Sequence, residues 1–391
     1  MKKFNKNPIR GAKKLIRWTS IYLDTGIIRP HFDGKRELFI MISSFSRGGA
    51  QRVASVLASE LSDFYHVTCI TTKDVDNAYA LDERVELIRI PWEKLGPDRT
   101  RRLVILLKKI RRPVASISFM FDSNEINLWG KCSCKAILSE RNNPAKKMPE
   151  RFPETVRQYR QADHVIFQSE IVRDLYDEDI RRHSTILPNP VSVTCYASPQ
   201  TRHRIVTMGR LHPQKNQAML IRAFAEFHKD HPDYTLSIYG EGELEQDLRA
   251  LACDLGIGEA VLFHGNIDNI HPEIADAEMF VLSSDYEGLS NALLEAMMMG
   301  IPCISTSCEG SADVIRPGEN GILVPVRDGQ ALADAMRILA DDEELRKSIG
   351  LNGRKTGEGF RKEAVAEKWL EMIRKVSSGN KRKFRLQQKN H

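Results

Sequence analysis

The chain has 391 residues, of which 41% are hydrophobic and 28% are charged. This composition is close to the globular average and excludes a wholly disordered chain, and the length suits two domains rather than one core. The formal net charge of +6 is unevenly distributed, because seven cations lie in residues 1–17 and five in 378–391, without any acid. Subtracting those twelve charges leaves −6 for residues 18–377, so an acidic body lies between two basic ends.

No apolar run approaches the roughly 20 residues that a membrane-spanning helix needs. The basic N-terminus lacks the apolar stretch of a secretory signal, and the seven cysteines suit a reducing cytosol. Cys132 and Cys134 are too close together for the usual spacing of a zinc site, so we interpret them as small residues beside a strand. These features favour a cytoplasmic protein without a transmembrane segment.

Short apolar runs alternate with longer amphipathic ones through the first half of the chain. They predict strands at 37–44, 66–71, 85–90, 115–119, 136–139 and 164–168, and helices at 50–61 and 99–112. Gly48 and Gly49 form the loop between the first strand and the first helix. Strands that alternate with helices are typical of a parallel sheet with helices on both faces.

A turn-rich segment around residues 188–201 interrupts this pattern and predicts a linker. The alternation then resumes, with strands expected at 204–208, 234–239, 261–264, 279–283, 303–305 and 321–324, and helices at 218–229, 243–255, 291–299 and 360–376. We therefore expect two doubly wound, Rossmann-like α/β domains. Their binding sites should lie outside the carboxyl ends of the strands and in a cleft between the domains.

The densest candidate site is the segment DYEGLSNALLE at 285–295. On one continuous helix, Glu287 and Glu295 would lie about 80° apart. If the helix begins near Ser290, a favoured N-cap residue, Glu287 lies in the preceding loop and the N–H groups of Leu289, Ser290 and Asn291 suit a phosphate. An ordinary strand-loop-helix with solvated glutamates is the alternative.

A second candidate site follows the first strand of the second series, where Gly209 and Arg210 precede Lys215. A guanidinium can bind phosphate oxygens bidentately and an ammonium adds a point charge, so this pair could neutralise a leaving diphosphate. A polar loop that caps the next helix is an equally good explanation. Gly240 and Gly242 end another strand, where they allow close backbone approach but also fit a simple turn.

Taken together, these segments resemble glycosyltransferase family 4, a retaining family with the GT-B fold. The resemblance spans most of 37–375 and rests on the Glu287–Glu295 pair, Arg210 with Lys215, the glycine turn at 240–242 and the segment SRGGA at 46–50. The segments ISFM at 117–120 and LSERNNP at 138–144 are similar to N-domain motifs of transferases that build bacterial surface polysaccharides and lipid-linked oligosaccharides.

The resemblance implies roles for the matching residues. Arg210 and Lys215 would hold the donor diphosphate and stabilise it as it leaves, and Glu287 would contact the hydroxyls of the donor sugar. Glu295 would hydrogen-bond the ribose, and the N–H groups at 289–291 would contact phosphate.

The glycines and one departure from the family complete the expected site. Gly48 and Gly49 would let the N-domain loop approach donor and acceptor, and Gly240 is assigned to donor binding. Many family members carry a histidine after the strand at 136–139, where this chain has Glu140 and Arg141. Either residue could contact the acceptor or the donor sugar, and a salt-bridged loop pair is the alternative.

A divalent metal is not expected, because fixed cations and a helix N-terminus can stabilise the leaving diphosphate. The competing GT-A plan uses an Asp-x-Asp string to hold a metal, and two strings fit, at 74–76 and 177–179. Two α/β halves argue against GT-A, so we predict a cofactor-free enzyme. With no protein nucleophile evident, the resemblance implies front-face displacement in which the leaving phosphate helps deprotonate the acceptor.

The helix at 99–112 combines an apolar stretch with many cations: Arg99, Arg101, Arg102, Lys108, Lys109, Arg111 and Arg112. This pattern suits an interfacial helix on an anionic membrane, and a domain helix with a solvated basic edge is the alternative. Nucleic acid is not expected, because the body is acidic and the tails lack interleaved aromatic residues.

The sequence thus predicts a retaining GT-B transferase at the cytoplasmic membrane face. It would move a hexose or N-acetylhexosamine from a nucleotide sugar, expected to be UDP-linked, to a lipid-linked glycan. A nucleotide-sugar 2-epimerase-like isomerase and a non-catalytic nucleotide-sugar-binding protein are the alternatives. The expected parts are a basic extension (1–36), an acceptor-side domain (37–195), a donor-side domain (196–359), a helix packing back on the N-domain (360–377) and a basic tail (378–391).

Overall fold

The structure, a computed structural model, describes residues 34–46, 48–75 and 79–387. The basic N-terminal segment, Arg47 of the glycine loop, Asp76 of one Asp-x-Asp string and the end of the basic tail lie outside the described residues. The chain divides into two compact units, which are described separately. One unit comprises the described residues up to Ser139 with Gln161–His164 and the chain from Ile373 onward, and the other comprises Glu140–Arg160 with Val165–Met372.

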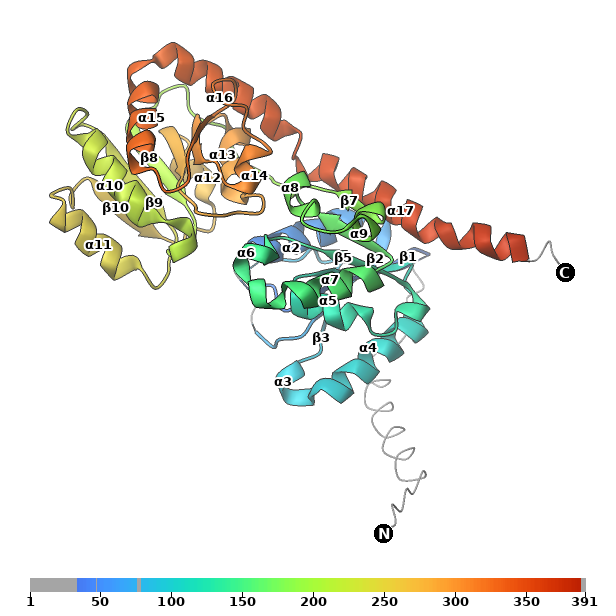
Figure 1. Ribbon diagram of the computed structural model, residues 1–391. Coiled ribbons are helices and arrows are strands. Elements are labelled where there is room, and N and C mark those ends of the chain that lie inside the picture. Colours follow the sequence, from blue (N-terminus) through green and yellow to red (C-terminus); the bar gives the residue numbers. More distant parts are fainter. Residues whose placement is uncertain (1–33, 47, 76–78, 388–391) are drawn as a thin grey trace, which may run out of the picture. The chain divides into compact units, whose positions relative to one another are not determined.

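The first half of the chain, coloured blue to green in Figure 1, forms a seven-stranded sheet. The strand order is β3-β2-β1-β4-β5-β6-β7. Its strands are β1 (Arg36–Ile42), β2 (Tyr65–Thr71), β3 (Glu86–Arg89), β4 (Ala115–Phe119), β5 (Lys135–Ser139), β6 (His164–Phe167) and β7 (Ser184–Ile186). The pairs β2–β3, β1–β2, β1–β4, β4–β5 and β6–β7 are parallel, as the alternating pattern predicts.

Helices and short helical turns connect these strands. They are α2 (Gly49–Leu61), α3 (Trp92–Leu95), α4 (Pro97–Arg111), α5 (Phe121–Leu128), η1 (Lys131–Ser133), α6 (Pro144–Lys147), η2 (Pro149–Arg151), α7 (Phe152–Gln161), α8 (Glu170–Arg173) and α9 (Glu178–Arg182). Each strand predicted for this half of the chain is present within two residues of its expected bounds. Strand β7 was not predicted, because its three half-buried residues give little of the apolar pattern by which a strand is recognised.

The second half forms a six-stranded sheet in the order β10-β9-β8-β11-β12-β13. Its strands are β8 (Arg202–Met208), β9 (Thr235–Tyr239), β10 (Val261–Gly265), β11 (Ala277–Leu282), β12 (Cys303–Thr306) and β13 (Ile322–Val324), and neighbouring strands are parallel. This order confirms a doubly wound α/β sheet whose winding reverses between β8 and β11.

Eight helices and one helical turn accompany the second sheet in the described residues. They are η3 (Pro213–Lys215), α10 (Gln217–His228), α11 (Glu245–Asp254), α12 (Ile270–Ile274), α13 (Asn291–Met299), α14 (Glu309–Ala312), α15 (Gly329–Asp341), α16 (Glu343–Glu358) and α17 (Lys362–Gln387). The last helix therefore extends beyond the predicted 360–376. No helix among the described residues is both long and apolar enough to cross a bilayer.

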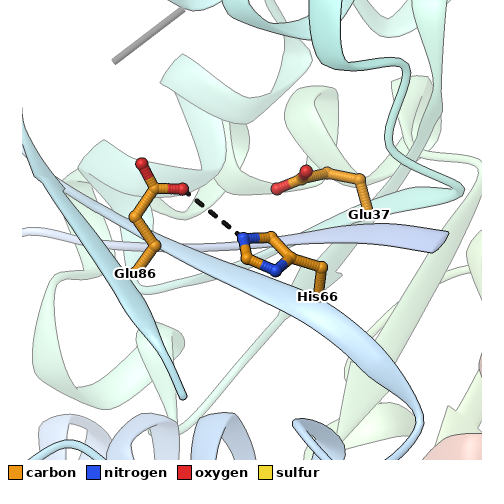
Figure 2. Close-up of side chains that lie close together, drawn as sticks. All are labelled: Glu37, His66 and Glu86. Atoms are coloured by element: carbon orange, nitrogen blue, oxygen red, sulfur yellow. Dashed lines mark ion pairs between the residues drawn. The ribbon is translucent and has the colours of Figure 1, made fainter. Parts of the chain in front are cut away.

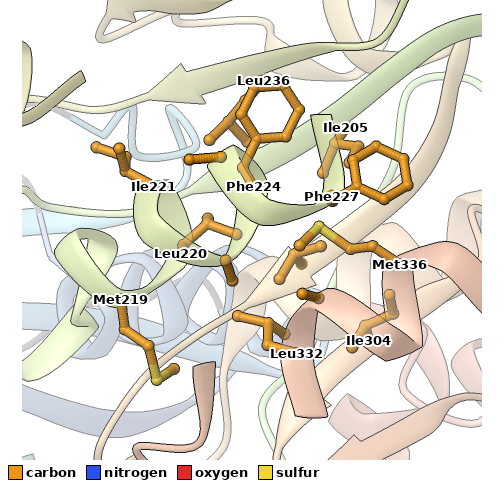
Figure 3. Close-up of a cluster of buried hydrophobic side chains, with 14 of the residues drawn as sticks. Ile205, Met219, Leu220, Ile221, Phe224, Phe227, Leu236, Ile304, Leu332 and Met336 are labelled. Atoms are coloured by element: carbon orange, nitrogen blue, oxygen red, sulfur yellow. The ribbon is translucent and has the colours of Figure 1, made fainter. Parts of the chain in front are cut away.

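Apolar side chains cover both faces of the second sheet. Ile205 of β8 belongs to a cluster in which Phe224 and Phe227 of α10 meet Met336 of α15 (Figure 3). The next residue along β8, Val206, belongs to a separate cluster with the α13 side chains. Because successive strand residues point to opposite faces, the sheet is packed on both sides, and its loops are left at the edges to carry polar groups.

Two cations of the basic helix are interior rather than surface residues. Lys108 of α4 is fully buried and its Nζ donates to the Oδ1 of Asn127 at 2.9 Å and to that residue's carbonyl oxygen. Arg111 is also buried and bonds Glu86 through both terminal nitrogens. The prediction that all seven cations of this helix serve a surface was therefore wrong for these two.

Candidate active site

The winding of the second sheet reverses between β8 and β11, and two of the predicted motifs follow these strands directly. Arg210 and Lys215 lie in the loop after β8, and Glu287 lies in the loop after β11. Loops at such a reversal separate to opposite faces and leave a crevice at the carboxyl edge. The sheet order thus explains why motifs 72 residues apart meet.

Lys215 and Glu287 form an ion pair, with 2.5 Å between Nζ and Oε1. The same carboxylate oxygen accepts a hydrogen bond from the Ser284 hydroxyl at 3.0 Å. The Lys215 and Glu287 side chains are 19% and 12% exposed, so the pair is shielded but remains open to solvent. Arg210 is exposed and no carboxylate among the described residues pairs with its guanidinium, so it is available to an anion.

Backbone and side-chain bonds fix the two loops to each other. The Asp285 N–H donates to the carbonyl oxygen of Gln214 at 2.9 Å, and the Gln214 amide donates to the carbonyl oxygen of Tyr286 at 2.9 Å. Asp285 accepts from Asn216 at 2.8 Å and pairs with Arg327 at 2.6 Å. Because these contacts join the residues on either side of Lys215 to the two residues that precede Glu287, they hold together the two loops that carry the ion pair.

The glycine turn after β9 supports the loop after β8. Gly240 has φ +134°, which L side chains rarely adopt, and a Cβ there would overlap the carbonyl oxygen of Gly209. A Cβ on Gly242 would likewise overlap the carbonyl oxygen of Leu211. These glycines allow two backbone segments to touch just beside Arg210.

Helix α13 begins where the sequence predicts. Ser290 is the N-cap, and its hydroxyl accepts from the Leu293 N–H at 3.4 Å. The Leu289 N–H donates to the Oε1 of Gln168 at 2.9 Å, so a phosphate could use that group only if Gln168 released it. The N–H groups of Ser290 and Asn291 belong to the helix start, where backbone donors lack partners within the helix.

Glu295 lies in the second turn of α13, and its side chain is only 3% exposed. Its Oε2 atom is 3.2 Å from the Nε2 of His271, which is also buried. The Nδ1 of that histidine accepts the Thr194 N–H at 3.2 Å. Glu295 is therefore held by a defined partner inside the fold.

Glu140 and Arg141 both lie in internal networks. The Glu140 carboxylate accepts from the Tyr159 hydroxyl at 2.6 Å and from the N–H groups of Arg141 and Asn142. The Arg141 guanidinium donates to the Asn189 Oδ1 at 3.0 Å, and burial lowers its pKa to about 9. The two side chains are 8% and 5% exposed, so neither points freely into solvent.

Asn189 connects Arg141 to the start of α13. Its Nδ2 donates to the carbonyl oxygen of Leu289 at 2.9 Å and to the Asn291 Oδ1 at 2.7 Å, and its Oδ1 also accepts from Gln168 at 2.9 Å. Sequence reasoning did not select Asn189, Gln168 or His271 as site residues. The only local signal was an asparagine between two prolines, which was interpreted as a turn.

Gly48 and Gly49 belong to the other unit and are therefore described separately from the residues above. Gly48 is the N-cap of α2, its carbonyl oxygen accepts the Arg52 N–H at 3.0 Å, and its own N–H donates to the Tyr79 hydroxyl at 3.3 Å. Gly48 therefore ends the turn from β1 into α2 as the sequence predicts, and Gly49 is the first residue of the helix, one position earlier than predicted.

One cluster in the first unit has the composition of a metal site: Glu37, His66 and Glu86 (Figure 2). These residues begin β1, β2 and β3, at the amino edge of the sheet and not at the carboxyl edge where ligands bind. The Arg111 guanidinium bonds Glu86 and lies 3.7 Å from Glu37, so the two carboxylates already face a buried cation. This donor set fits a structural ion network better than a metal.

The Asp-x-Asp strings have structural contacts where they are described. Asp177 caps α9 by accepting the Ile180 N–H at 3.2 Å, and it pairs with Arg160. Asp74 pairs with Lys94 at 2.5 Å. Both aspartates therefore have cationic partners of their own.

Comparison with known families gives a match on the part of the chain that carries the Lys215–Glu287 ion pair. Residues 196–356 match the family model "Glycosyl transferases group 1". The segment includes Arg210, Lys215, Glu287 and Glu295.

Two curated relatives are similar to this chain. A Campylobacter jejuni alpha-1,4-N-acetyl-D-galactosaminyltransferase, named for the acceptor GalNAc-alpha-(1->4)-GalNAc-alpha-(1->3)-diNAcBac-PP-undecaprenol, is 26% identical over 88% of this chain and 99% of its own length. The lipopolysaccharide core biosynthesis glycosyltransferase LpsE of Rhizobium meliloti is 35% identical over 43% of this chain and 49% of its own length.

Solved structures with the same fold cover nearly the whole chain. HepE from Anabaena, solved in complex with UDP and glucose, aligns with a TM-score of 0.75 at 17% identity, over 87% of this chain and all of HepE. The lipopolysaccharide outer core galactosyltransferase WaaB aligns with a TM-score of 0.68 at 19% identity, over 86% of this chain and 99% of WaaB.

Proposed function

Because the chain is a glycosyltransferase with the GT-B fold and a group 1 domain at 196–356, we propose that it is a retaining, metal-independent enzyme that uses a nucleotide sugar. The donor is a UDP-hexose or UDP-N-acetylhexosamine, and the acceptor is a lipid-linked glycan of bacterial surface polysaccharide synthesis. The observation that carries the proposal is the ion pair between Lys215 and Glu287, which joins the loop that also carries Arg210 to the loop that leads into α13.

The proposed chemistry follows from the charges in this crevice. As the bond between the sugar C1 and the diphosphate oxygen breaks, negative charge grows on the leaving group. Arg210, Lys215 and the N-terminus of α13 stabilise that charge, while Glu287 accepts hydrogen bonds from the sugar hydroxyls. The acceptor oxygen bonds C1 on the same face, and its proton passes to the leaving phosphate oxygen, so that the anomeric configuration is retained.

The ion pair between Lys215 and Glu287 also gives the crevice a charge-balanced state before the donor binds. Glu287 neutralises Lys215 at 2.5 Å, and a diphosphate competes for the same ammonium. Arg210 is the cation that an incoming diphosphate can engage without breaking this pair. We therefore assign initial donor capture to Arg210 and leaving-group stabilisation to both cations.

The nature of donor and acceptor is inferred from similar proteins. HepE was solved with UDP and glucose, and the Campylobacter relative is named for an undecaprenol-diphosphate-linked acceptor. A lipid-linked acceptor would place this enzyme at the inner face of the cell membrane. The same donor without an acceptor requirement would instead indicate an isomerase of the 2-epimerase kind.

The test is a panel of nucleotide sugars offered with lipid extracts, using wild type, Glu287→Ala and the control Glu319→Ala, which removes an exposed glutamate of the same unit. We expect one donor to be consumed only with acceptor present, with retention at C1 and no change when EDTA is added. Glu287→Ala should lower turnover by about 100-fold or more. Near-normal turnover of Glu287→Ala refutes the site, and conversion of donor without acceptor refutes transfer.

We further propose that α4 attaches the enzyme to anionic lipid. Five cations of this helix and its C-cap are exposed: Arg99, Arg101, Arg102, Lys109 and the C-cap residue Arg112. Trp92 and Trp129, which pack against the same apolar cluster as Val104 and Leu107 of α4, are half-buried and stack with ring centroids 5.7 Å apart. Exposed cations together with amphipathic aromatic rings suit the lipid headgroup region, where each cation contributes about 1 kcal/mol.

A flotation assay tests the attachment surface. Arg101→Gln/Arg102→Gln should lose binding to vesicles with anionic lipid, whereas the equal charge change in Arg222→Gln/Lys355→Gln, on exposed residues of α10 and α16, should retain it. Neutral vesicles should bind neither double variant. Equal binding to neutral and anionic vesicles contradicts the proposal.

A further inference from the structure

Glu295 is expected to bind the donor ribose, and in the structure its carboxylate already has a hydrogen-bonding partner within the protein, His271. It lies in the second turn of α13 with its side chain 3% exposed, and the Nε2 of His271 is 3.2 Å from its Oε2. A long side chain in a helix has several rotamers, and a hydrogen bond from a buried partner selects one. The orientation of the Glu295 carboxylate therefore depends on His271.

The hydrogen bonds around His271 determine which ring nitrogen carries the proton. The Thr194 N–H is 3.2 Å from Nδ1, and an amide N–H can only donate, so Nδ1 accepts with its lone pair. The Thr194 hydroxyl lies 3.3 Å from the same nitrogen and has an acceptor of its own in the Asn269 Oδ1, at 3.0 Å. The neutral imidazole thus carries its proton on Nε2, where it points at Glu295.

The two partners of this bond belong to helices that pack together, because Ile274 of α12 and Leu294 of α13 lie in one apolar cluster. His271 belongs to α12, which follows β10, and Glu295 belongs to α13, which follows Glu287. The segment that carries Thr194 also contains Val191, whose N–H donates to the carbonyl oxygen of Phe360 at 2.9 Å. The histidine is therefore held on one side by a fixed backbone and presents its N–H to the carboxylate on the other.

We propose that His271 is a positioning residue for nucleotide recognition: its Nε2–H fixes Glu295 so that the carboxylate accepts hydrogen bonds from the donor ribose hydroxyls. This inference rests on the proposed function, because it presumes a nucleoside diphosphate in the crevice. His271 touches neither sugar nor diphosphate in this scheme. Its loss should weaken discrimination of the ribose without altering the leaving-group chemistry of Arg210 and Lys215.

The test compares binding of a nucleoside diphosphate with binding of its 2′,3′-dideoxy analogue by calorimetry, using UDP with dideoxy-UDP and GDP with dideoxy-GDP. The variants are His271→Leu, His271→Gln, Glu295→Ala and the double variant His271→Leu/Glu295→Ala. The control is His231→Leu, which removes another histidine–carboxylate pair of the same unit, 3.0 Å from Asp341.

We expect wild type and His231→Leu to prefer the ribonucleotide, and His271→Leu to lose about tenfold of that preference. Glu295→Ala should lose the preference entirely, and adding His271→Leu to it should change nothing further. His271→Gln, which keeps an N–H donor, should recover most of the preference. Affinity for the dideoxy analogue should stay constant across all variants that unfold at the wild-type temperature.

Three outcomes overturn the inference and are distinguishable. If His271→Leu lowers thermal stability but keeps the wild-type ribonucleotide preference, the histidine serves folding alone. If Glu295→Ala keeps the preference, the ribose contact lies elsewhere although the nucleotide binds. If wild type binds neither UDP nor GDP, the proposed function fails and the inference fails with it.

Discussion

Gly310 gives the sharpest test of how the fold supports the site, because it lies against the loop that carries Glu287. A Cβ added to Gly310 in α14 would overlap the carbonyl group of Gly288 and lie 2.8 Å from the Cα of Leu289. Ordinary contact begins at 3.4 Å, so the loop must retreat by at least 0.6 Å at Leu289 and further at Gly288. The backbone obstacle cannot rotate away as a side chain could.

The expected consequence of Gly310→Ala is a large loss of activity with a smaller loss of stability. A misplacement of about 1 Å can lower catalysis by about 100-fold, so a displacement of this size should lower kcat/KM at least tenfold. Overpacking of this kind typically lowers the free energy of unfolding by about 1–3 kcal/mol, which leaves most of the protein folded. Transfer kinetics and thermal unfolding of the same preparation separate the two effects.

Gly329→Ala is the matched control. Gly329 begins α15, and its added Cβ would meet only the Cγ of Met219, at 3.6 Å, which is an ordinary contact. This variant should keep wild-type kinetics and a similar unfolding temperature. Wild-type kinetics of Gly310→Ala would refute the reasoning, because they would mean that the loop after β11 can move without disturbing transfer.

Two further predictions concern the buried cations of α4. Arg111→Met leaves the carboxylates of Glu37 and Glu86 without their buried partner. This variant should lower the free energy of unfolding, measured by urea denaturation, by about 3–5 kcal/mol. A loss below about 1 kcal/mol would contradict the assignment of Arg111 as the partner that stabilises both carboxylates. Burial lowers the pKa of Lys108 to about 8 from 10.5, so the unfolded chain binds more protons between these pH values and the stability contributed by this group rises with pH across that window. Relative to Lys108→Met, the free energy of unfolding of wild type should rise by about 3 kcal/mol between pH 8 and 10.5. If the difference in unfolding free energy between the two proteins does not depend on pH, the lowered pKa of Lys108 is refuted.

The elements that sequence predicted best are those whose signals are local. Helix α13 begins at Asn291 as expected, because a serine N-cap acts within three residues of itself. The meeting of Lys215 with Glu287 also follows from sequence, since the strand pattern and the reversal of a doubly wound sheet bring those two loops together. The resemblance to a transferase family supplied the roles, and the sheet order supplies the physical reason for their proximity.

The same reasoning failed for charged residues that are buried, as the two cations of α4 show. Residues 100, 104, 107, 108 and 111 of α4 share one helical face, and that face is buried, so phase along the helix would have placed Lys108 and Arg111 inside. Both residues were predicted to lie on the surface because the charges of this helix were counted without asking which helical face each residue occupies. Their partners, Asn127 and Glu86, lie 19 and 25 residues away and cannot be identified from local pattern.

Asn189 and His271 illustrate a deeper limit of single-sequence reasoning. Each is a polar residue in a turn or a short helix, the commonest setting for an exposed side chain, yet each is buried and holds part of α13. Their partners lie 102 and 24 residues away, so the burial that makes these bonds strong exists only after the sheet has formed. In this enzyme, therefore, the groups expected to touch substrate follow from motif and sheet order. The groups that hold them in place follow only from tertiary contacts, which is why the ribose-binding test must include His271 as well as Glu295.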